Sequence, residues 1–295
     1  MGGDRGPALP LIGVVVLTQG RRPAELQRAL GSVLAQRDVR TDVVVVGNGC
    51  EPEGLPEGVR SLALPQNVGI PAGRNAGVGL VEGELLFFLD DDACVPDGGF
   101  LAEAARRFAA DPTLGALQPR VDVAGGGTPP RRWTPRLRSG DPRRPSHAFS
   151  LWEGAVVARR AAFTAAGGWP DSFFYAHEGI ELAWRIWDAG FRVWYAGDLV
   201  AEHPLTRTTR HHDFFRLNAR NRVWLARRNL PWVLAVPYVL TWTILQVLRS
   251  WRSPATLRPW LRGWAEGWRS PAGRRAPMGW STIGRMARLG RLPVF

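Results

Sequence analysis

The sequence predicts an α/β protein with a mixed, mainly parallel sheet that is flanked by helices. Short apolar runs alternate with helical segments between residues 11 and 89 of the 295-residue chain, and each run ends at turn or polar residues. This alternation is typical of βαβ units, in which a helix joins consecutive parallel strands. The expected strands are residues 11–17, 43–46, 59–64 and 85–89, and the expected helices are residues 23–34 and 71–80.

A second group of elements follows a stretch rich in Gly, Pro and Arg. We expect that stretch, residues 124–146, to be a mobile loop or an insertion. Regular structure is then expected to return with a strand at residues 155–157, a helix from about residue 178 to residue 189, and a strand at residues 191–195.

Three consecutive carboxylates, Asp90, Asp91 and Asp92, directly follow the apolar run 85–89. Neighbouring carboxylates repel one another and resist desolvation, so a chain that places them beside a buried strand usually supplies a cation. Mg²⁺ and Mn²⁺ favour oxygen ligands and commonly bridge to substrate phosphates. The run therefore favours a metal site, and the alternative is a solvated acidic turn.

Other polar turns are expected at the same edge of the sheet. Thr18-Gln19 and Gly47-Asn48-Gly49 also follow strands, and ligands of such sheets bind at the carboxyl ends of the strands. The helix after residue 70 carries closely spaced glycines and Arg74, whose planar cation suits a diphosphate. Its alternative interpretation is a tightly packed helix with a surface arginine.

Charged residues and tryptophans are unevenly distributed along the chain. Residues 1–202 carry 21 Arg against 24 acidic residues, a net charge of −3, whereas residues 203–295 carry 17 Arg against 2 acidic residues, a net charge of +15. The second part also holds eight of the 14 Trp. A cationic, Trp-rich segment suits a membrane surface or nucleic acid, and without a recognised nucleic-acid module we expect the membrane. Two cysteines offer no disulfide framework, which is typical of a reducing compartment.

Taken together, these motifs resemble glycosyltransferase family 2, the inverting nucleotide-diphospho-sugar transferases with a GT-A fold. The resemblance covers roughly residues 10–205 and rests on six pieces in the family's order. They are Thr18, residues 42–49, residues 67–77, residues 89–93, Gly167-Gly168-Trp169 and residues 174–185. It implies a nucleoside-diphosphate sugar as donor, contacted by Thr18, Asn48, Gly73, Arg74, Asn75 and Asp90.

The resemblance also implies a metal centre. Asp90 and Asp92 match the family's DxD motif, in which the first carboxylate meets the nucleotide and the last binds Mg²⁺ or Mn²⁺, and Asp91 is then a spacer. His203 stands where many family members carry a metal-ligating histidine. The alternative for His203 is an ordinary surface or packed residue.

Two departures from the family pattern bear on chemistry. Gly47 replaces the usual aspartate that recognises the base, so base contacts are expected from Asn48 or Gln19. Gly179 replaces the aspartate that serves as general base, and an inverting transfer needs a base near the attacking hydroxyl. We expect Glu178 to take this role. The other candidates are Glu181, which would otherwise be structural or acceptor-binding, and His177.

The C-terminal region predicts contact with a membrane. Residues 230–248 form an apolar stretch just long enough to span a bilayer. A single crossing from the cytoplasm would leave residues 249–295 outside with a net charge of +9, against the positive-inside tendency, so a re-entrant or in-plane segment is favoured. A helix at about residues 255–269 places Trp260, Trp264 and Trp268 on one face, which predicts an interfacial helix or, alternatively, one packed on the catalytic domain.

The sequence therefore predicts a catalytic domain at residues 1–205 and a membrane-associated helical region at residues 206–295. The predicted function is metal-dependent transfer of a sugar to a lipid-linked or cell-envelope glycan acceptor, on the cytoplasmic face of the cell membrane, with no role for nucleic acid. Two alternatives remain: a nucleotidyltransferase of similar fold, and a degenerate relative that binds a nucleotide sugar or acts as a scaffold in a membrane complex.

Overall fold

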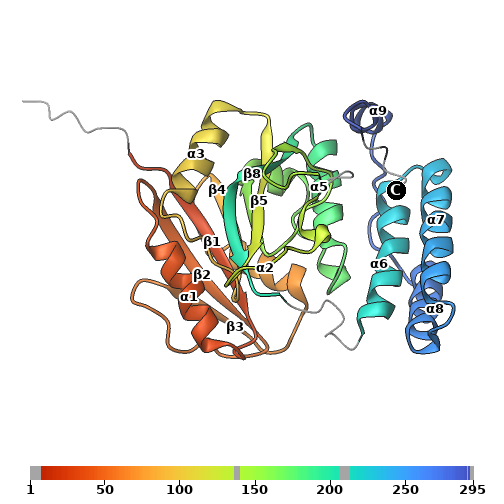
Figure 1. Ribbon diagram of the computed structural model, residues 1–295, viewed down its shortest axis with the longest axis horizontal. Coiled ribbons are helices and arrows are strands. Elements are labelled where there is room, and N and C mark those ends of the chain that lie inside the picture. The colour runs from red at the N-terminus through yellow and green to blue at the C-terminus, as the bar shows by residue number, and fades with distance from the viewer. Residues whose placement is uncertain (1–7, 136–139, 206–212, 291, 293–295) are drawn as a thin grey trace, which may run out of the picture.

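The computed structural model describes residues 8–135, 140–205, 213–290 and 292. An eight-stranded sheet with the order β3-β2-β1-β4-β7-β5-β8-β6 forms its centre (Figure 1). The first four strands in this order run parallel, β5 and β8 are parallel to each other, and β7 and β6 are antiparallel to their neighbours. The strands are β1 (Leu11–Thr18), β2 (Arg40–Asn48), β3 (Arg60–Leu64), β4 (Leu85–Asp90), β5 (Leu114–Val123), β6 (Ser146–His147), β7 (Ala155–Arg159) and β8 (Arg192–His203). The predicted mixed, mainly parallel α/β fold is confirmed.

Helices cover both faces of the sheet. Alternate strand residues point to opposite faces, so Val14 and Val16 pack with α1 and α3, whereas Val15 packs in the cluster that contains α4 and α5. α2 lies so close to the second face that a Cβ on Gly77 would stand 2.6 Å from the Val15 side chain. The helices are α1 (Pro23–Leu34), α2 (Ile70–Val78), α3 (Phe100–Ala110), α4 (Arg160–Ala165) and α5 (Glu178–Asp188).

The Gly-, Pro- and Arg-rich stretch after β5 is packed against the sheet in part. It contains the short helix η1 (Arg131–Trp133) and continues to β6, while residues 136–139 lie outside the described part. Trp133 is only 2% exposed, and the Gln118 side chain on β5 donates a hydrogen bond of 2.9 Å to its carbonyl. The prediction of a mobile loop is therefore wrong around Trp133, because a large indole and a buried amide fix the chain there.

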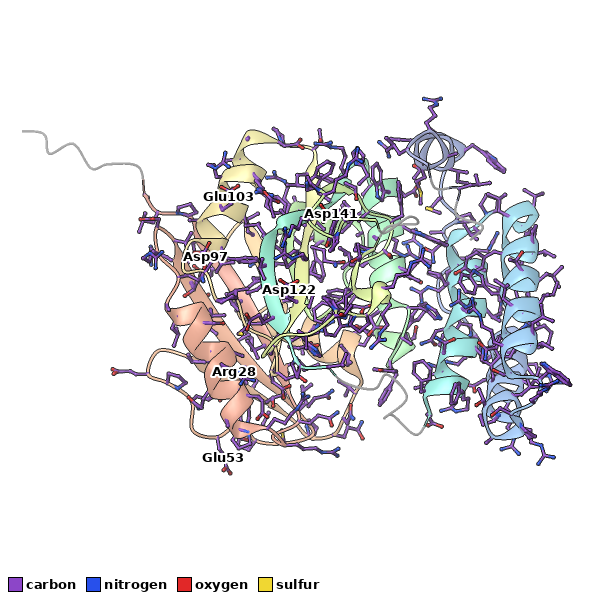
Figure 2. The ribbon with its side chains drawn as sticks, in the orientation of Figure 1. Arg28, Glu53, Asp97, Glu103, Asp122 and Asp141 are labelled. Atoms are coloured by element: carbon purple, nitrogen blue, oxygen red, sulfur yellow. The ribbon has the colours of Figure 1, made fainter. Side chains whose placement is uncertain are left out.

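Four further helices follow the sheet: α6 (Phe214–Asn229), α7 (Trp232–Ser250), α8 (Pro254–Arg269) and α9 (Trp280–Arg288). α6 stands beside α5 and separates the sheet from α7 and α8 (Figure 1). Side chains fill the space between the ribbons of α5 and α6 (Figure 2). The C-terminal region is thus packed onto the sheet-bearing part through α6.

The Trp face of α8 contacts protein. The predicted amphipathic helix is confirmed, but Trp260 is 2% exposed and a Cβ on Gly263 would overlap the carbonyl of Arg216 on α6. Trp264 and Trp268 pack against the same hydrophobic cluster. The interfacial role predicted for this face is therefore wrong, because the face that would enter the lipid is used for packing against α6.

α7 carries the apolar surface that α8 lacks. Within the described residues it is the one helix long and apolar enough to cross a membrane. Ala235, Tyr238 and Val239 are buried on one side, whereas the other side exposes five aliphatic side chains. These are Val233, Val236, Leu240, Ile244 and Leu248, each between 45% and 66% exposed, and we call them the α7 stripe.

Candidate active site

A cavity of about 500 Å³ lies at the carboxyl ends of β1, β2 and β4, and we call it the first cavity. Its position is the edge at which polar turns were expected from the sequence. Four residues that the sequence suggested as contacts of the nucleotide-sugar donor line this cavity. They are Thr18, Gln19, Asn48 and Asp90. The lining also includes Arg21, Arg22, Asn67, Gly69, Ile70, Asp91, Phe174 and Tyr175.

Asn48 holds the loop that leads into α2. Its Oδ1 accepts the N–H of Val68 at 2.8 Å and its Nδ2 donates to the carbonyl of Gly69 at 3.1 Å. Gly47 has no room for the family's aspartate, since a Cβ there would overlap the carbonyl of Cys50. With the Asn48 amide engaged by the backbone, the exposed side chain of Gln19 is the freer of the two candidates for contact with a base.

Arg74 is a buried cation aimed at the same edge. It is 1% exposed, its Nη2 donates to Asp90 Oδ1 at 2.6 Å, and its guanidinium lies 5.0 Å from the ring centre of Trp169. Burial raises the pKa of Asp90, but the charges of Arg74 and His203 outweigh it and lower that pKa below its usual value. The Nε and Nη1 atoms of Arg74 are buried without a hydrogen-bond partner. These two donors could bind an anion, and the surface-arginine alternative is wrong.

Gly73 and Asn75 support the site from behind. A Cβ on Gly73 would stand 2.6 Å from the Leu17 side chain, so this glycine permits close packing of α2 on β1. Asn75 donates to the carbonyl of Trp169 at 2.8 Å, accepts its N–H at 3.1 Å and donates to Asp171. Neither residue lines the first cavity, and both hold α2 and the Gly-Gly-Trp segment in place.

Asp91 does more than separate two functional carboxylates. It is 4% exposed and accepts hydrogen bonds from the Thr18 hydroxyl at 2.7 Å and from Arg22 Nη2 at 3.0 Å. Thr18 thus reaches the first cavity while its hydroxyl ties β1 to the turn after β4. Asp91, predicted as the spacer between the two functional carboxylates, also joins these two strand ends.

Asp90, Asp92 and His203 form a group whose ligand atoms all lie within 4.8 Å of one another. The Pro204 carbonyl can only accept, so His203 Nδ1, 2.7 Å away, carries a hydrogen and leaves Nε2 facing Asp92 Oδ1 at 3.1 Å. Two acceptors at this distance need a proton or a cation between them. Two carboxylates and a histidine whose ring is oriented by its hydrogen bond to the Pro204 carbonyl suit Mg²⁺ or Mn²⁺. Arg22 pairs with Asp92 here, and its partly exposed side chain can leave that position.

A second cavity of about 450 Å³ adjoins the first and shares Ile70, Asp90 and Tyr175 with it. Trp133 and Trp152 form an aromatic wall and stand edge-on to His203, with ring centres 5.5 and 5.0 Å away. Its polar lining consists mainly of Arg74, Arg132, Glu153, His177, Glu178, His203 and Asn218. Aromatic walls with a few convergent polar groups are typical of sugar-sized ligand sites.

The three candidate bases near the start of α5 differ in their surroundings. Glu178 is 3% exposed, and burial together with Glu153 raises its pKa to about 8. Burial and Arg222 lower the pKa of His177 well below its usual value, and its Nε2 donates to the carbonyl of Asn218 at 3.1 Å. Glu181 does not line the second cavity. Its carboxylate instead bonds Arg185 at 3.0 Å, Arg228 at 2.7 Å and Asn229 at 3.0 Å, which favours the structural alternative.

α6 fixes the loop that precedes α5. Phe174, Ala176 and His177 have positive φ angles of 63°, 75° and 71°, a conformation that L-residues hold only under constraint. The constraint is Asn221, which is fully buried and donates from Nδ2 to three loop carbonyls at 2.7 to 3.0 Å. A residue of the C-terminal region thereby shapes the second cavity.

The structure thus gathers most residues predicted for the site and adds others that sequence reasoning missed. Asp90, Asp92, His203, Arg74 and Glu178 meet where the two cavities join. The missed residues are Trp133, Trp152, Glu153 and Asn221. The sequence contains one indication of Glu153, a carboxylate shortly before a buried strand. A single acidic residue at such a place can have many structural roles, so this indication does not identify a site residue.

Comparison with known proteins agrees with this geometry. The model of glycosyl transferase family 2 matches residues 13–165. The pre-mycofactocin glycosyltransferase of Mycobacterium tuberculosis is 28% identical over 227 residues, which are 72% of this chain and 44% of that protein. The chain therefore spans less than half the length of this relative.

Solved structures share the fold at low identity. GalNAc-T7 with UDP, GalNAc and Mn²⁺ superposes with a TM-score of 0.65 at 16% identity, covering 98% of this chain and 59% of that one. The mannosyltransferase PcManGT of Pyrobaculum calidifontis with GDP-Man and Mn²⁺ gives 0.55 at 19% identity, covering 97% and 78%. TarS 1-349 of S. aureus with UDP-GlcNAc gives 0.58 at 14% identity, covering 87% and 81%. By its matched residues, the chain belongs to glycosyl transferase family 2, and its solved neighbours share its GT-A-like architecture.

Proposed function

We propose that the protein is a metal-dependent, inverting glycosyltransferase that moves a sugar from a nucleoside diphosphate to a hydroxyl of a lipid-linked or cell-envelope glycan. One observation supports the proposal: two cavities meet at Asp90, which belongs to the Asp90–Asp92–His203 group. The first cavity is lined by polar strand ends, Arg21 and Arg22, and the second by Arg74, His203, two glutamates and aromatic side chains. This is the arrangement expected for a charged donor on one side and a polar acceptor on the other.

The donor half would be bound by Arg74, Asp90, Asp92 and His203. Mg²⁺ or Mn²⁺ held by Asp90, Asp92 and His203 would supply positive charge to the leaving diphosphate. Arg74 donates to the same phosphates through its two unpartnered N–H groups, and Arg22 moves from Asp92 to a phosphate oxygen. The charge that develops on the leaving group is thereby stabilised.

The acceptor half would be bound in the second cavity. Trp152, backed by the buried Trp133, provides an apolar wall for a sugar ring. An acceptor hydroxyl there attacks the anomeric carbon opposite the diphosphate, and a carboxylate that lines the cavity takes its proton. Sequence reasoning assigns this role to Glu178 and names Glu181 and His177 as its rivals. Of these three, Glu178 and His177 line the cavity.

Binding and turnover of a donor panel test the function. Thermal shifts with UDP and with GDP, each with and without Mn²⁺, are expected to show metal-dependent stabilisation by one of them. UDP-GlcNAc, UDP-GalNAc and GDP-mannose are then assayed for release of nucleoside diphosphate, with a lipid extract of bacterial envelopes as acceptor source. Release of pyrophosphate would indicate a nucleotidyltransferase, and binding without release would indicate a degenerate binding protein or scaffold.

We further propose that the α7 stripe lies in the plane of the cytoplasmic leaflet. A surface helix normally exposes polar residues, whereas the α7 stripe exposes aliphatic side chains along its whole length, with exposed Trp232 and Trp251 near its ends. An in-plane position is favoured over a single span because α7 packs along α6, which carries Arg216, Arg220 and Arg222. A crossing would bring those charges into the bilayer.

Sedimentation with vesicles containing phosphatidylglycerol tests this placement. Leu240→Asp with Ile244→Asp is expected to release most of the protein from the vesicles, whereas the control Leu34→Asp, at an equally exposed site on α1, retains binding. In cells, a cysteine at Gly284 on α9 should resist an impermeant reagent until lysis. Labelling of intact cells would contradict the in-plane, cytoplasmic position.

A further inference from the structure

Another carboxylate lies close to Gly179, the position on α5 where the family's aspartate is missing. A Cβ added to Gly179 would overlap the carbonyl of Leu151 and stand 2.5 Å from Glu153 Oε1. The Leu151 N–H also bonds the Gly179 carbonyl at 3.1 Å. The segment before β7 therefore rests directly on the first turn of α5, and it can do so only because residue 179 has no side chain.

Glu153 points its carboxylate into this position. Its Oε1 accepts the N–H of Gly179 at 2.8 Å, so a carboxylate carried by the neighbouring segment caps the first turn of α5. Glu153 and Glu178 both line the second cavity, next to Arg74 and on the side of the aromatic wall. The space that a side chain at position 179 would fill is thus taken by the carboxylate of Glu153, which comes from another part of the chain.

Exposure separates the two glutamates. Glu178 is 3% exposed and its Oε2 is buried without a hydrogen-bond partner, whereas Glu153 is partly exposed within the cavity. A general base must come within hydrogen-bond reach of the attacking hydroxyl. Glu153 can meet this requirement with the oxygen that Gly179 does not use, whereas Glu178 lines the same cavity with a side chain that is almost fully buried.

We propose that Glu153 is the catalytic residue that accepts the proton of the acceptor hydroxyl, and that Glu178 is a positioning residue behind it. The inference rests on the proposed function and deepens it. In the step, the acceptor oxygen forms a bond to the anomeric carbon as the bond from that carbon to the diphosphate oxygen breaks. The nucleoside diphosphate leaves with the electron pair, and the hydroxyl proton passes to Glu153 and then to solvent.

The raised pKa of Glu178 agrees with this division of roles. Burial and the charge of Glu153 raise it to about 8, so Glu178 holds its proton more tightly than an exposed glutamate does. Burial also raises the pKa of Glu153 above its usual value, and the charge of Arg74 and the Gly179 N–H offset only part of that rise.

Glu153→Gln separates a base from a positioning residue. Glutamine keeps the shape and an oxygen that can accept the Gly179 N–H, but it cannot take a proton. With the donor that the wild-type chain turns over, kcat is expected to fall at least about 10²-fold while the Kd of the corresponding nucleoside diphosphate with Mn²⁺ stays within twofold. The matched control, Glu178→Gln, is expected to lose less than about 10-fold in kcat.

Each other result decides against the proposal. Turnover by Glu153→Gln within threefold of wild type, or a loss confined to Glu178→Gln, would refute the role of Glu153. Loss of nucleotide affinity in Glu153→Gln would make Glu153 a structural residue. If Glu153→Gln does not fold, Glu153→Ala with added formate replaces it, and formate must restore turnover. Wild-type protein that binds UDP or GDP but turns over no donor would refute the proposed function itself.

Discussion

The first and second cavities share Asp90 but are built from different kinds of structure. The first is formed by the ends of β1, β2 and β4, whose register is fixed by continuous parallel pairing. The second is formed by the segment before β7, the loop before α5, and α6, which follows the last strand of the sheet. The part of the site that would bind the donor therefore follows from the sheet, whereas the part that would bind the acceptor depends on long-range contacts. Within one family, this division allows acceptor chemistry to change while the donor chemistry is kept.

The largest expected effect concerns the metal group at the border of the two cavities. Asp92→Asn removes one of three candidate ligands, so Mn²⁺-dependent binding of UDP or GDP should be lost and turnover should fall at least about 10³-fold. Isothermal titration with and without EDTA measures the binding. The control Asp97→Asn changes an exposed carboxylate outside the group and should leave both quantities unchanged. Intact Mn²⁺-dependent affinity for UDP or GDP in Asp92→Asn would contradict a metal site formed by Asp90, Asp92 and His203.

A second effect concerns Arg74, which lines the second cavity beside Asp90 and would bind the diphosphate of the donor. Arg74→Lys keeps the charge but loses the planar fork whose Nε and Nη1 atoms are unpartnered, so the affinity for UDP or GDP should fall roughly 10- to 100-fold. Arg60→Lys, at a partly exposed ion pair with Asp42, serves as the control. An affinity that Arg74→Lys leaves intact would mean that Arg74 only supports Asp90 and Trp169.

The acceptor side should respond to a residue far from the sheet. Asn221→Ala removes the side-chain donor to the carbonyls of Tyr175 and Ala176 and one of the donors to that of Phe173, which should cost about 1–3 kcal/mol of unfolding free energy. Because the loop lines the second cavity, KM for the acceptor should rise more than the Kd of the nucleotide. Gln246→Ala on α7 is a control for loss of a helix side chain. Equal losses on both sides would show that the two cavities are not independent.

The smallest effect is a pH dependence of stability from Glu178. Its pKa is raised from 4.5 to about 8 by burial and by Glu153, so the folded protein holds this proton more tightly than the unfolded chain. The resulting stability is fully present below about pH 4.5 and is lost as the pH rises toward 8. Glu178→Gln removes this dependence, and its Tm should exceed that of wild type by a few degrees at pH 8 and by less at pH 5. The same Tm difference at both values would contradict the raised pKa.

The sequence predicted the first cavity well because its signals are local. Apolar runs ending in Thr18, Asn48 and Asp90 identify strands, and parallel strands bring those ends together without further information. Arg74 followed from its place in a glycine-rich first turn. Asn75 was assigned to the donor, yet its amide is used by Trp169, a partner 94 residues away that no local pattern announces.

The second cavity was harder to predict because its decisive contacts are distant. The sequence shows only that Gly179 lacks the family's carboxylate, whereas the structure shows that Leu151 and Glu153 occupy the space of a side chain at this position. The Trp face of α8 had the spacing of an interfacial helix, but spacing cannot tell lipid from a neighbouring helix such as α6. The net charge of the C-terminal region likewise did not distinguish solvent-exposed arginines from the buried Arg220, which donates to the carbonyl of Phe173 beside the active-site loop.

The stereochemistry of the product tests the relation of the two cavities most directly. If the donor's diphosphate lies on the side of the first cavity and the acceptor attacks from the second, the anomeric carbon must invert. Proton NMR of the first-formed product from an α-linked nucleotide sugar is therefore predicted to show a β-glycoside. A first-formed α-glycoside would mean that donor and acceptor approach from the same face, and it would contradict the assignment of the two cavities.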